Sequence, residues 1–154
     1  MQSFECCKAV NCCYFNSAVI GPNPWEQKEK LLASDPATFR IFGGAVSLSN
    51  NIALIGARGG GTGSAYVYRS IDDGNTWPQA AKLVAADGES GDLFGKSVSV
   101  DGFIALIGAV GDDDQGTDAG SAYIFQSTDT GATWSQGAKL VASDGVPSAG
   151  FGIS

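Results

Sequence analysis

The stretch Lys82-Leu83-Val84-Ala85-Ala86-Asp87 decides the fold, because the chain contains it three times in slightly varied form. The other copies are Lys30-Leu31-Leu32-Ala33-Ser34-Asp35 and Lys139-Leu140-Val141-Ala142-Ser143-Asp144, at offsets of 52 and 57 residues. Each Lys is followed twelve positions later by a Phe-Gly pair and preceded five positions earlier by a Trp. These in-phase matches indicate an internal repeat of about 50 residues.

The composition suits short strands and tight turns. Glycine contributes 22 of 154 residues, and charged residues make up 16%, below the roughly 25% of typical soluble domains. The absence of His excludes a Ser–His or Cys–His nucleophile pair and a His-ligated zinc. A net charge of −7 argues against a nucleic-acid partner. No apolar stretch approaches the length of a membrane span.

Each copy predicts a four-stranded antiparallel meander. In the second copy, residues 96–100 alternate between apolar and polar, and Asp101-Gly102 gives a two-residue hairpin signal. The apolar run 103–107 is typical of a strand covered on both faces. Further strands are expected at 121–125 and within 133–141. The first copy repeats this pattern around the turn Asn50-Asn51.

Four-stranded units at this spacing are typical of β-propeller blades. We therefore predict an all-β fold with about two complete blades of a larger propeller. The blades span 42–85 and 94–142, and another begins at 151–154. Because a blade is apolar on both faces, its expected neighbours are the remaining blades of a parent protein or further copies of the chain.

The first 24 residues are expected to form an irregular leader or the remnant of a preceding blade. The repeat phase predicts a third strand at residues 12–16. It also favours a strand at 26–32, although the sequence there would suit a short helix as well. The cysteines form two vicinal pairs, Cys6-Cys7 and Cys12-Cys13, whose spacing does not match a zinc site and whose role stays open. This segment makes a poor signal peptide.

Residues 70–77 and 127–134 both fit the pattern S-x-D-x-G-x-T-W. The pattern resembles the Asp box of sialidases and related propellers, where it is a structural turn between the third and fourth strands. Asp and Ser side chains can accept hydrogen bonds from the backbone of such a turn, and Gly adopts angles that other residues resist. We therefore expect both segments to stabilise hairpins.

The Phe-Gly pairs extend the resemblance. Phe42-Gly43 is followed by Gly56-Ala57, and Phe94-Gly95 by Gly108-Ala109 at the same distance. This pattern resembles the FG-GAP repeat, known from the propeller of integrin α chains, over residues 25–154. The resemblance implies an extracellular or cell-surface binding module. It does not carry over the integrin calcium loop, because the turns between the first two strands are too short here.

A different loop offers candidate calcium ligands. Residues 111–118 form an insertion relative to the first copy and include Asp112, Asp114 and Asp118. Carboxylate oxygens are what calcium prefers, so these three residues are the candidate metal ligands. The alternative is a solvated acidic turn without an ion.

The meander topology places several acidic residues at one end of the blades. Successive connections alternate between the two ends, so the second-to-third and blade-to-blade loops share an end opposite the S-x-D-x-G-x-T-W turns. The residues expected at this acidic rim are Asp35, Asp87, Glu89, Asp92, Asp112, Asp113, Asp114, Asp118 and Asp144. Such a rim would attract cations or a basic partner.

We expect a non-enzymatic binding or adhesion module that contacts a protein or glycan, assisted by calcium. One alternative is a purely structural segment of a larger repeat protein. Another is a piece of a sialidase-like glycosidase, although the chain has only Arg40, Arg58 and Arg69 to form the arginine cluster that such enzymes need.

Overall fold

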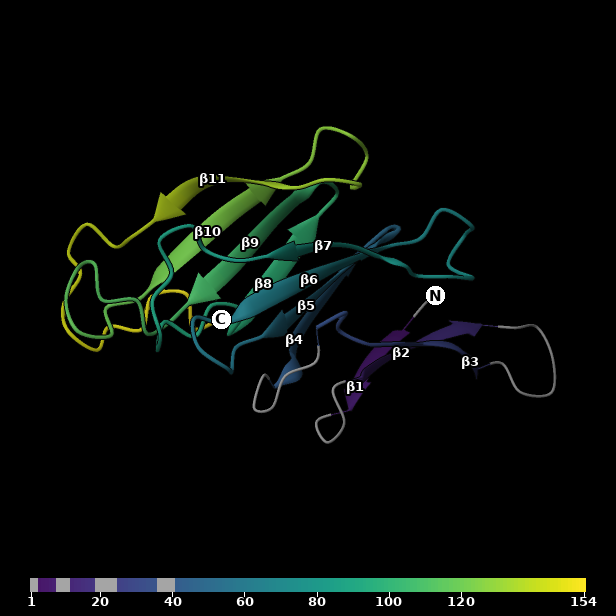
Figure 1. The fold of residues 1–154 in the computed structure, drawn as a ribbon, viewed down its shortest axis with the longest axis horizontal. Coiled ribbons are helices and arrows are strands. Elements are labelled where there is room, and N and C mark those ends of the chain that lie inside the picture. The colour runs from purple at the N-terminus through teal and green to yellow at the C-terminus, as the bar shows by residue number, and fades with distance from the viewer. Residues whose placement is uncertain (1–2, 8–11, 19–24, 36–40) are drawn as a thin grey trace.

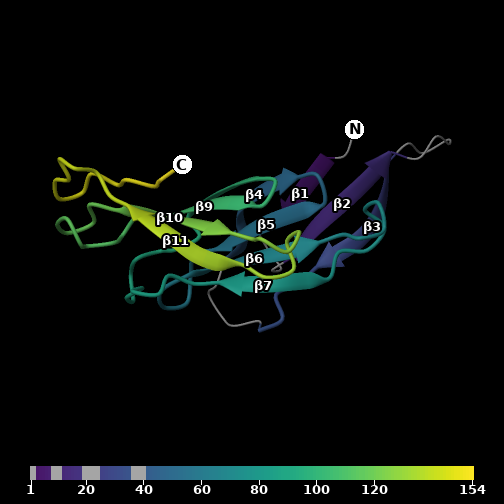
Figure 2. The ribbon, with the colours of Figure 1, turned by 90° about the horizontal axis from the view of Figure 1, so that it is seen from above.

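A computed structural model describes residues 3–7, 12–18, 25–35 and 41–154. Within these ranges the regular structure consists of eleven β-strands in three antiparallel sheets. The described residues include no helix that could cross a membrane. Figures 1 and 2 show the sheets one after another in chain order. The predicted all-β class is therefore confirmed.

Two sheets are complete four-stranded meanders. The first complete sheet, in the order β4-β5-β6-β7, consists of β4 (Phe42–Ser49), β5 (Ile52–Ala57), β6 (Ser64–Arg69) and β7 (Gln79–Leu83). The second complete sheet, in the order β8-β9-β10-β11, consists of β8 (Ser97–Asp101), β9 (Ile104–Ala109), β10 (Ser121–Gln126) and β11 (Ser135–Leu140). All neighbouring strands are antiparallel, as expected of propeller blades.

The hairpin between β8 and β9 lies one residue later than the sequence suggested. Asp101 pairs with Ile104, so the turn residues are Gly102 and Phe103 instead of Asp101 and Gly102. Gly102 has a φ of 54°, and Asn50 at the equivalent position of the first sheet has a φ of 51°. The turn requires a left-handed residue at its first central position, and this requirement outweighs the apolar character of Phe103.

A third, N-terminal sheet contains β1 (Ser3–Cys7), β2 (Cys12–Ala18) and β3 (Trp25–Leu31). Its register matches the complete sheets: Tyr14 pairs with Lys30 as Tyr66 pairs with Lys82. Residues 3–7 and 12–18 thus form strands, as in the alternative of a blade remnant with a strand at 12–16, and the alternative of an irregular leader is wrong for these residues. The strand β3 also excludes the helix considered for the segment after Pro24.

The main core lies between the two complete sheets. Buried side chains of both sheets form one cluster there, with Ile52 and Leu54 from β5 facing Ile107 from β9. A second cluster lies between the first complete sheet and β3, where Leu31 packs with residues such as Ile55. All six residues of β5 are buried, as predicted for a strand covered on both faces.

The first two Phe-Gly pairs each position an aromatic ring within their own blade. The ring of Phe42 meets Tyr66 edge-on at 5.5 Å between centroids, and Phe94 meets Tyr123 in the same way at 5.4 Å. The glycine that follows Phe94 has a φ of 87°, a left-handed conformation that side chains rarely adopt. The phenylalanine thus fills the core while the glycine redirects the chain into the first strand.

The two sheets approach each other at the backbone as well as through side chains. Gly63 and Phe94 form an isolated parallel bridge between the blades, and Gly120 and Phe151 repeat it at the next position. Ser47 Oγ accepts a hydrogen bond from the N–H of Val100 at 3.0 Å. These contacts tie each blade to its neighbour in a fixed register.

Residues 70–77 and 127–134, called the S-x-D turns below, connect the third and fourth strands of the two complete sheets, as predicted. In the first turn, Gly74 N donates to Ser70 Oγ at 2.8 Å and Thr76 N donates to Asp72 Oδ1 at 2.9 Å. The equivalent two bonds in the second turn measure 2.8 Å each. The threonine hydroxyl and backbone N–H that bind each carboxylate lower the pKa of Asp72 and of Asp129.

A substitution at Gly56 can test how closely the backbones of the two blades approach each other. A Cβ at this position would overlap the carbonyl oxygen of Gly95 in the neighbouring blade, so Gly56→Ala should destabilise the fold by about 1–3 kcal/mol or more. Gly137→Ala is the matched control, because its Cβ would meet only the Ile124 carbonyl oxygen at 3.4 Å. Urea denaturation measures both variants. Equal stability of Gly56→Ala and wild type would contradict the packing of the two sheets.

Candidate functional site

Acidic side chains gather at one end of the blades. The end that carries the 111–120 loop and the connection between the complete sheets lies opposite the S-x-D turns (Figure 1). Six acidic residues line a cavity of about 160 Å³ there: Asp87, Glu89, Asp92, Asp112, Asp113 and Asp114. We call these six residues the acidic end. The predicted acidic rim is therefore confirmed for them.

Lys139 places its ammonium group among three of these carboxylates. Its Nζ lies 2.8 Å from Asp87 Oδ2, 2.8 Å from Asp112 Oδ2 and 2.6 Å from Asp114 Oδ2. The strand β11 directs the lysine across the ring of Tyr123 on β10, with Nζ 5.2 Å from the ring centroid. An ammonium group has three N–H donors, so the three carboxylates can occupy all of them.

Asp112 is the buried member of this group, with 4% of its surface exposed. Its Oδ1 accepts hydrogen bonds from Ser121 Oγ at 2.8 Å and from the N–H of Asp114 at 3.2 Å. Its Oδ2 accepts one from the Tyr123 hydroxyl at 2.9 Å. Burial by itself would raise the pKa of Asp112, but the hydrogen bonds from Lys139 and the two hydroxyls outweigh it and hold the pKa below its usual value.

The same ion pairs shift the pKa of their other members. Burial would lower the pKa of Lys139, but the bonds to the carboxylates raise it above its ordinary value. The Lys139 ammonium also lowers the pKa of Asp87. Asp92 differs, because its carboxyl group is buried without such a cation and its pKa is raised. The site therefore keeps Lys139, Asp87 and Asp112 charged at neutral pH.

The first complete sheet contains a simpler version of this arrangement. Lys82 Nζ lies 2.6 Å from Asp35 Oδ2 and 5.8 Å from the centroid of the Tyr66 ring. The Tyr66 hydroxyl donates to Asp35 Oδ1 at 2.6 Å. In both sheets, the Lys of one motif copy pairs with the Asp of the preceding copy. The Lys and Asp that recur in each copy of the Lys-Leu motif therefore form an ion pair between neighbouring repeats, which we call the inter-repeat pair.

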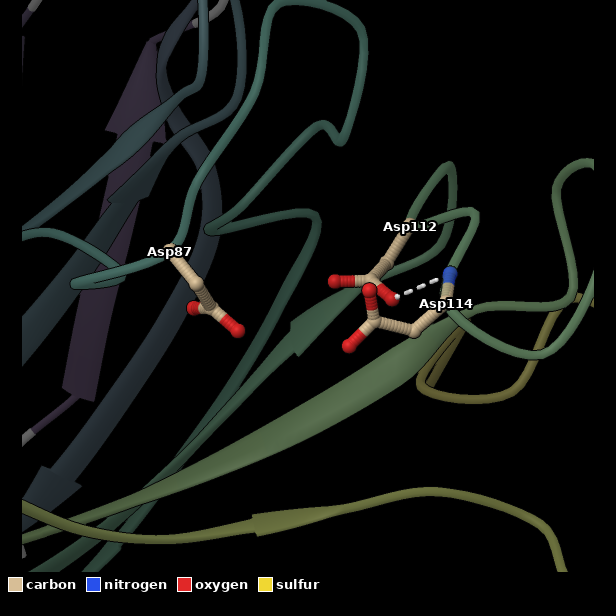
Figure 3. A group of neighbouring side chains, drawn as sticks. All are labelled: Asp87, Asp112 and Asp114. Carbon is tan, nitrogen blue, oxygen red and sulfur yellow. Dashed lines mark hydrogen bonds between the residues drawn. The ribbon is translucent and has the colours of Figure 1, made fainter.

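The structure brings together two of the three predicted metal ligands. Asp112 and Asp114 lie in one group with Asp87 (Figure 3), and one carboxylate oxygen of each residue lies within 4.8 Å of those of the other two. Asp118 does not join this group; its N–H donates to Asp113 Oδ1 at 2.6 Å and stabilises the loop. The sequence interpretation placed Asp87 in the acidic rim but not among the metal ligands, and it missed Lys139, although both occupy invariant positions of the repeated motif.

The two meanders, their backbone bridges and the inter-repeat pairs define a β-propeller repeat protein. Comparison with known families finds the FG-GAP repeat at residues 25–68 and 77–125, which together cover more than half of the chain. The chain therefore belongs to the FG-GAP repeat family, and the resemblance noted in the sequence is confirmed. A search of curated proteins found no significant match.

Removing the ammonium group should affect the two blades differently. Lys139→Met leaves the buried carboxylate of Asp112 without its cation, so we expect a loss of about 3–5 kcal/mol in the free energy of unfolding. Lys82→Met is the matched control, because that pair is more exposed, at 31% and 43%, and should contribute at most about 1 kcal/mol. Urea denaturation at neutral pH measures both. A larger loss for Lys82→Met would contradict this assignment.

Proposed function

We propose that the chain is a non-enzymatic binding module of an extracellular or cell-surface FG-GAP protein, and that its ligand contacts the acidic end. The observation that carries this proposal is the placement of the loop that differs between the copies. The insertion at 111–120 lies at the acidic end and supplies three of its six carboxylates. Loops that vary on a shared framework are where binding residues concentrate.

The charge of this end suggests the chemistry of its ligand. Six carboxyl groups line the cavity, and Lys139 provides one positive charge among them. The remaining negative charge favours a basic protein segment and disfavours anionic glycans. At the opposite end, the polar groups of each S-x-D turn are hydrogen-bonded within that turn, which supports a structural role for these turns.

The placement of the arginines supports the non-enzymatic proposal over a sialidase-like one. Arg58 lines a cavity beside Phe42, whereas Arg69 lines a different cavity beside Pro78. Arg69 donates from Nη2 to Thr130 Oγ1 at 3.0 Å, which joins the end of β6 to the second S-x-D turn. Arg40 lies outside the described residues. The two described arginines therefore do not line a common cavity that could bind a substrate carboxylate.

A fluorescent oligolysine peptide tests the proposed ligand chemistry. We expect binding that weakens as salt rises, and an affinity several-fold lower for the Glu89→Gln/Asp113→Asn variant, because both exposed side chains line the cavity. The control Asp73→Asn/Asp101→Asn removes the same formal charge elsewhere and should change the affinity less. Fluorescence anisotropy measures all three proteins. Equal weakening in both variants, or no binding at low salt, would favour the purely structural alternative.

The sequence suggested calcium binding by Asp112, Asp114 and Asp118, and we propose that Lys139 opposes it at the first two of these residues in the wild type. An ion at the first two residues must displace the ammonium group, so we expect equal wild-type melting temperatures in calcium and in EDTA. In Lys139→Met the freed carboxylates should bind calcium, and occupancy at about 100 times Kd would add about 2.7 kcal/mol. A calcium-dependent rise in the wild type would instead indicate that the ion displaces the lysine.

A further inference from the structure

The outer face of the second complete sheet exposes apolar residues whose counterparts in the first complete sheet are buried. The buried positions are Ile52, Leu54 and Leu83, with 1%, 0% and 3% of their surface exposed. The equivalent residues are Ile104, Leu106 and Leu140, with 57%, 41% and 38% exposed. The second sheet covers the first group, and no described residue covers the second group in the same way. The repeat itself therefore indicates that a sheet of the same kind fits this face.

Polar residues differ between the two sheets in the same way: they are hydrogen-bonded in the first complete sheet and exposed in the second. Ser47 Oγ accepts a hydrogen bond from the N–H of Val100, and Ser49 Oγ accepts one from the N–H of Gly102, both at 3.0 Å. These bonds connect the first strand of one blade to the first strand of the next. The equivalent residues of the second sheet, Ser99 and Asp101, are exposed. Their oxygen atoms are thus placed to accept the same two bonds from another sheet.

The inter-repeat ion pair shows which surface would supply that sheet. Asp35 pairs with Lys82 and Asp87 with Lys139, so each Asp pairs with the Lys of the following motif copy. Asp144 is the third Asp of the series; it is exposed and forms no ion pair with any described residue. The third Lys of the series is Lys30 in the N-terminal sheet.

Lys30 lies on the face of that sheet that points away from the first complete sheet. Its neighbour Leu31 is buried against the first complete sheet, and successive side chains of a strand point to opposite faces. Lys30 is exposed, and in the register it pairs with Tyr14 as Lys82 pairs with Tyr66. The Lys30 ammonium group is therefore available to form the ion pair that Asp144 does not form with any described residue.

We propose that copies of this chain associate head to tail, with the outer face of the second complete sheet against the N-terminal sheet of the next copy. Asp144 of one copy pairs with Lys30 of the next, which continues the contact found between neighbouring blades. Ile104 and Leu106 supply the apolar centre of this interface. The surface differs from the acidic end, so the inference is independent of the proposed ligand. A head-to-tail interface leaves each assembly with a free face at both ends unless it closes into a ring.

Sedimentation velocity over a range of protein concentrations tests the association. We expect oligomers in the wild type and a dissociation constant roughly tenfold or more higher for Leu106→Asp, because burial of a leucine contributes about this factor. Ile71→Asp is the matched control, because Ile71 is 74% exposed and lies on an S-x-D turn away from both faces. Circular dichroism melts establish that each variant is folded.

Charge exchange tests the direction of the contact. Asp144→Lys and Lys30→Asp should each weaken association by a few-fold, as expected for an exposed pair. The double variant Asp144→Lys/Lys30→Asp should restore it, because the pair forms again with its charges reversed. A monomer at every concentration would overturn the proposal. Weakening by Leu106→Asp without any effect of the charge variants would overturn the head-to-tail arrangement, since it would indicate two copies that meet through the same face.

Discussion

A four-stranded sheet with apolar side chains on both faces is stable in water only when both faces are covered. This requirement governs the rest of the structure. The strand β5 has all six residues buried because one sheet lies on each side of it. The strand β9 has the same sequence, Ile-Ala-Leu-Ile-Gly-Ala, yet two of its residues are exposed. The difference in burial comes from the neighbours alone.

The requirement for close neighbours also explains the glycines of the Phe-Gly and Gly-Ala elements. At Gly56 and Gly108, the backbone of the following blade lies where a Cβ would be. The left-handed glycine after Phe94 lets the chain cross from one blade to the next while the ring stays in the core. The family motif therefore marks the contact between blades. It carries no information about a ligand, which explains why family membership leaves the binding partner to be argued from the loops.

The repeat phase made most of the fold predictable. It placed the strands of both complete sheets and favoured a strand over a helix for β3 against the local signal at Pro24. Two details were missed for different reasons. The β8–β9 turn depends on which residue takes the left-handed conformation, and Asp-Gly is a strong local signal that competes with the true pair Gly102-Phe103. The contact between Lys139 and Asp87 joins positions 52 residues apart, which no local pattern reveals.

The predicted metal ligands illustrate the same limit. The acidic loop was recognisable, but its ligands were all chosen from that one loop, whereas the structure combines Asp112 and Asp114 with Asp87 from the connection between the blades. A carboxylate as buried as Asp112 needs donors for its oxygen atoms, and a lysine on the adjacent strand meets that need. The inter-repeat Lys is common to both complete sheets, and the longer loop of the second sheet adds two more carboxylates to it.

The carboxyl groups of the acidic end lose their charge in a definite order as pH falls. Burial raises the pKa of Asp92, so this group is the first of the shifted carboxyl groups to be protonated as pH falls. Asp87 and Asp112 follow later, because the Lys139 ammonium favours their charged forms. Their folded pKa values lie below the unfolded ones, so their contribution to stability is present at neutral pH and is lost only in acid. The acidic end can therefore lose negative charge while the inter-repeat pair that joins the blades stays intact.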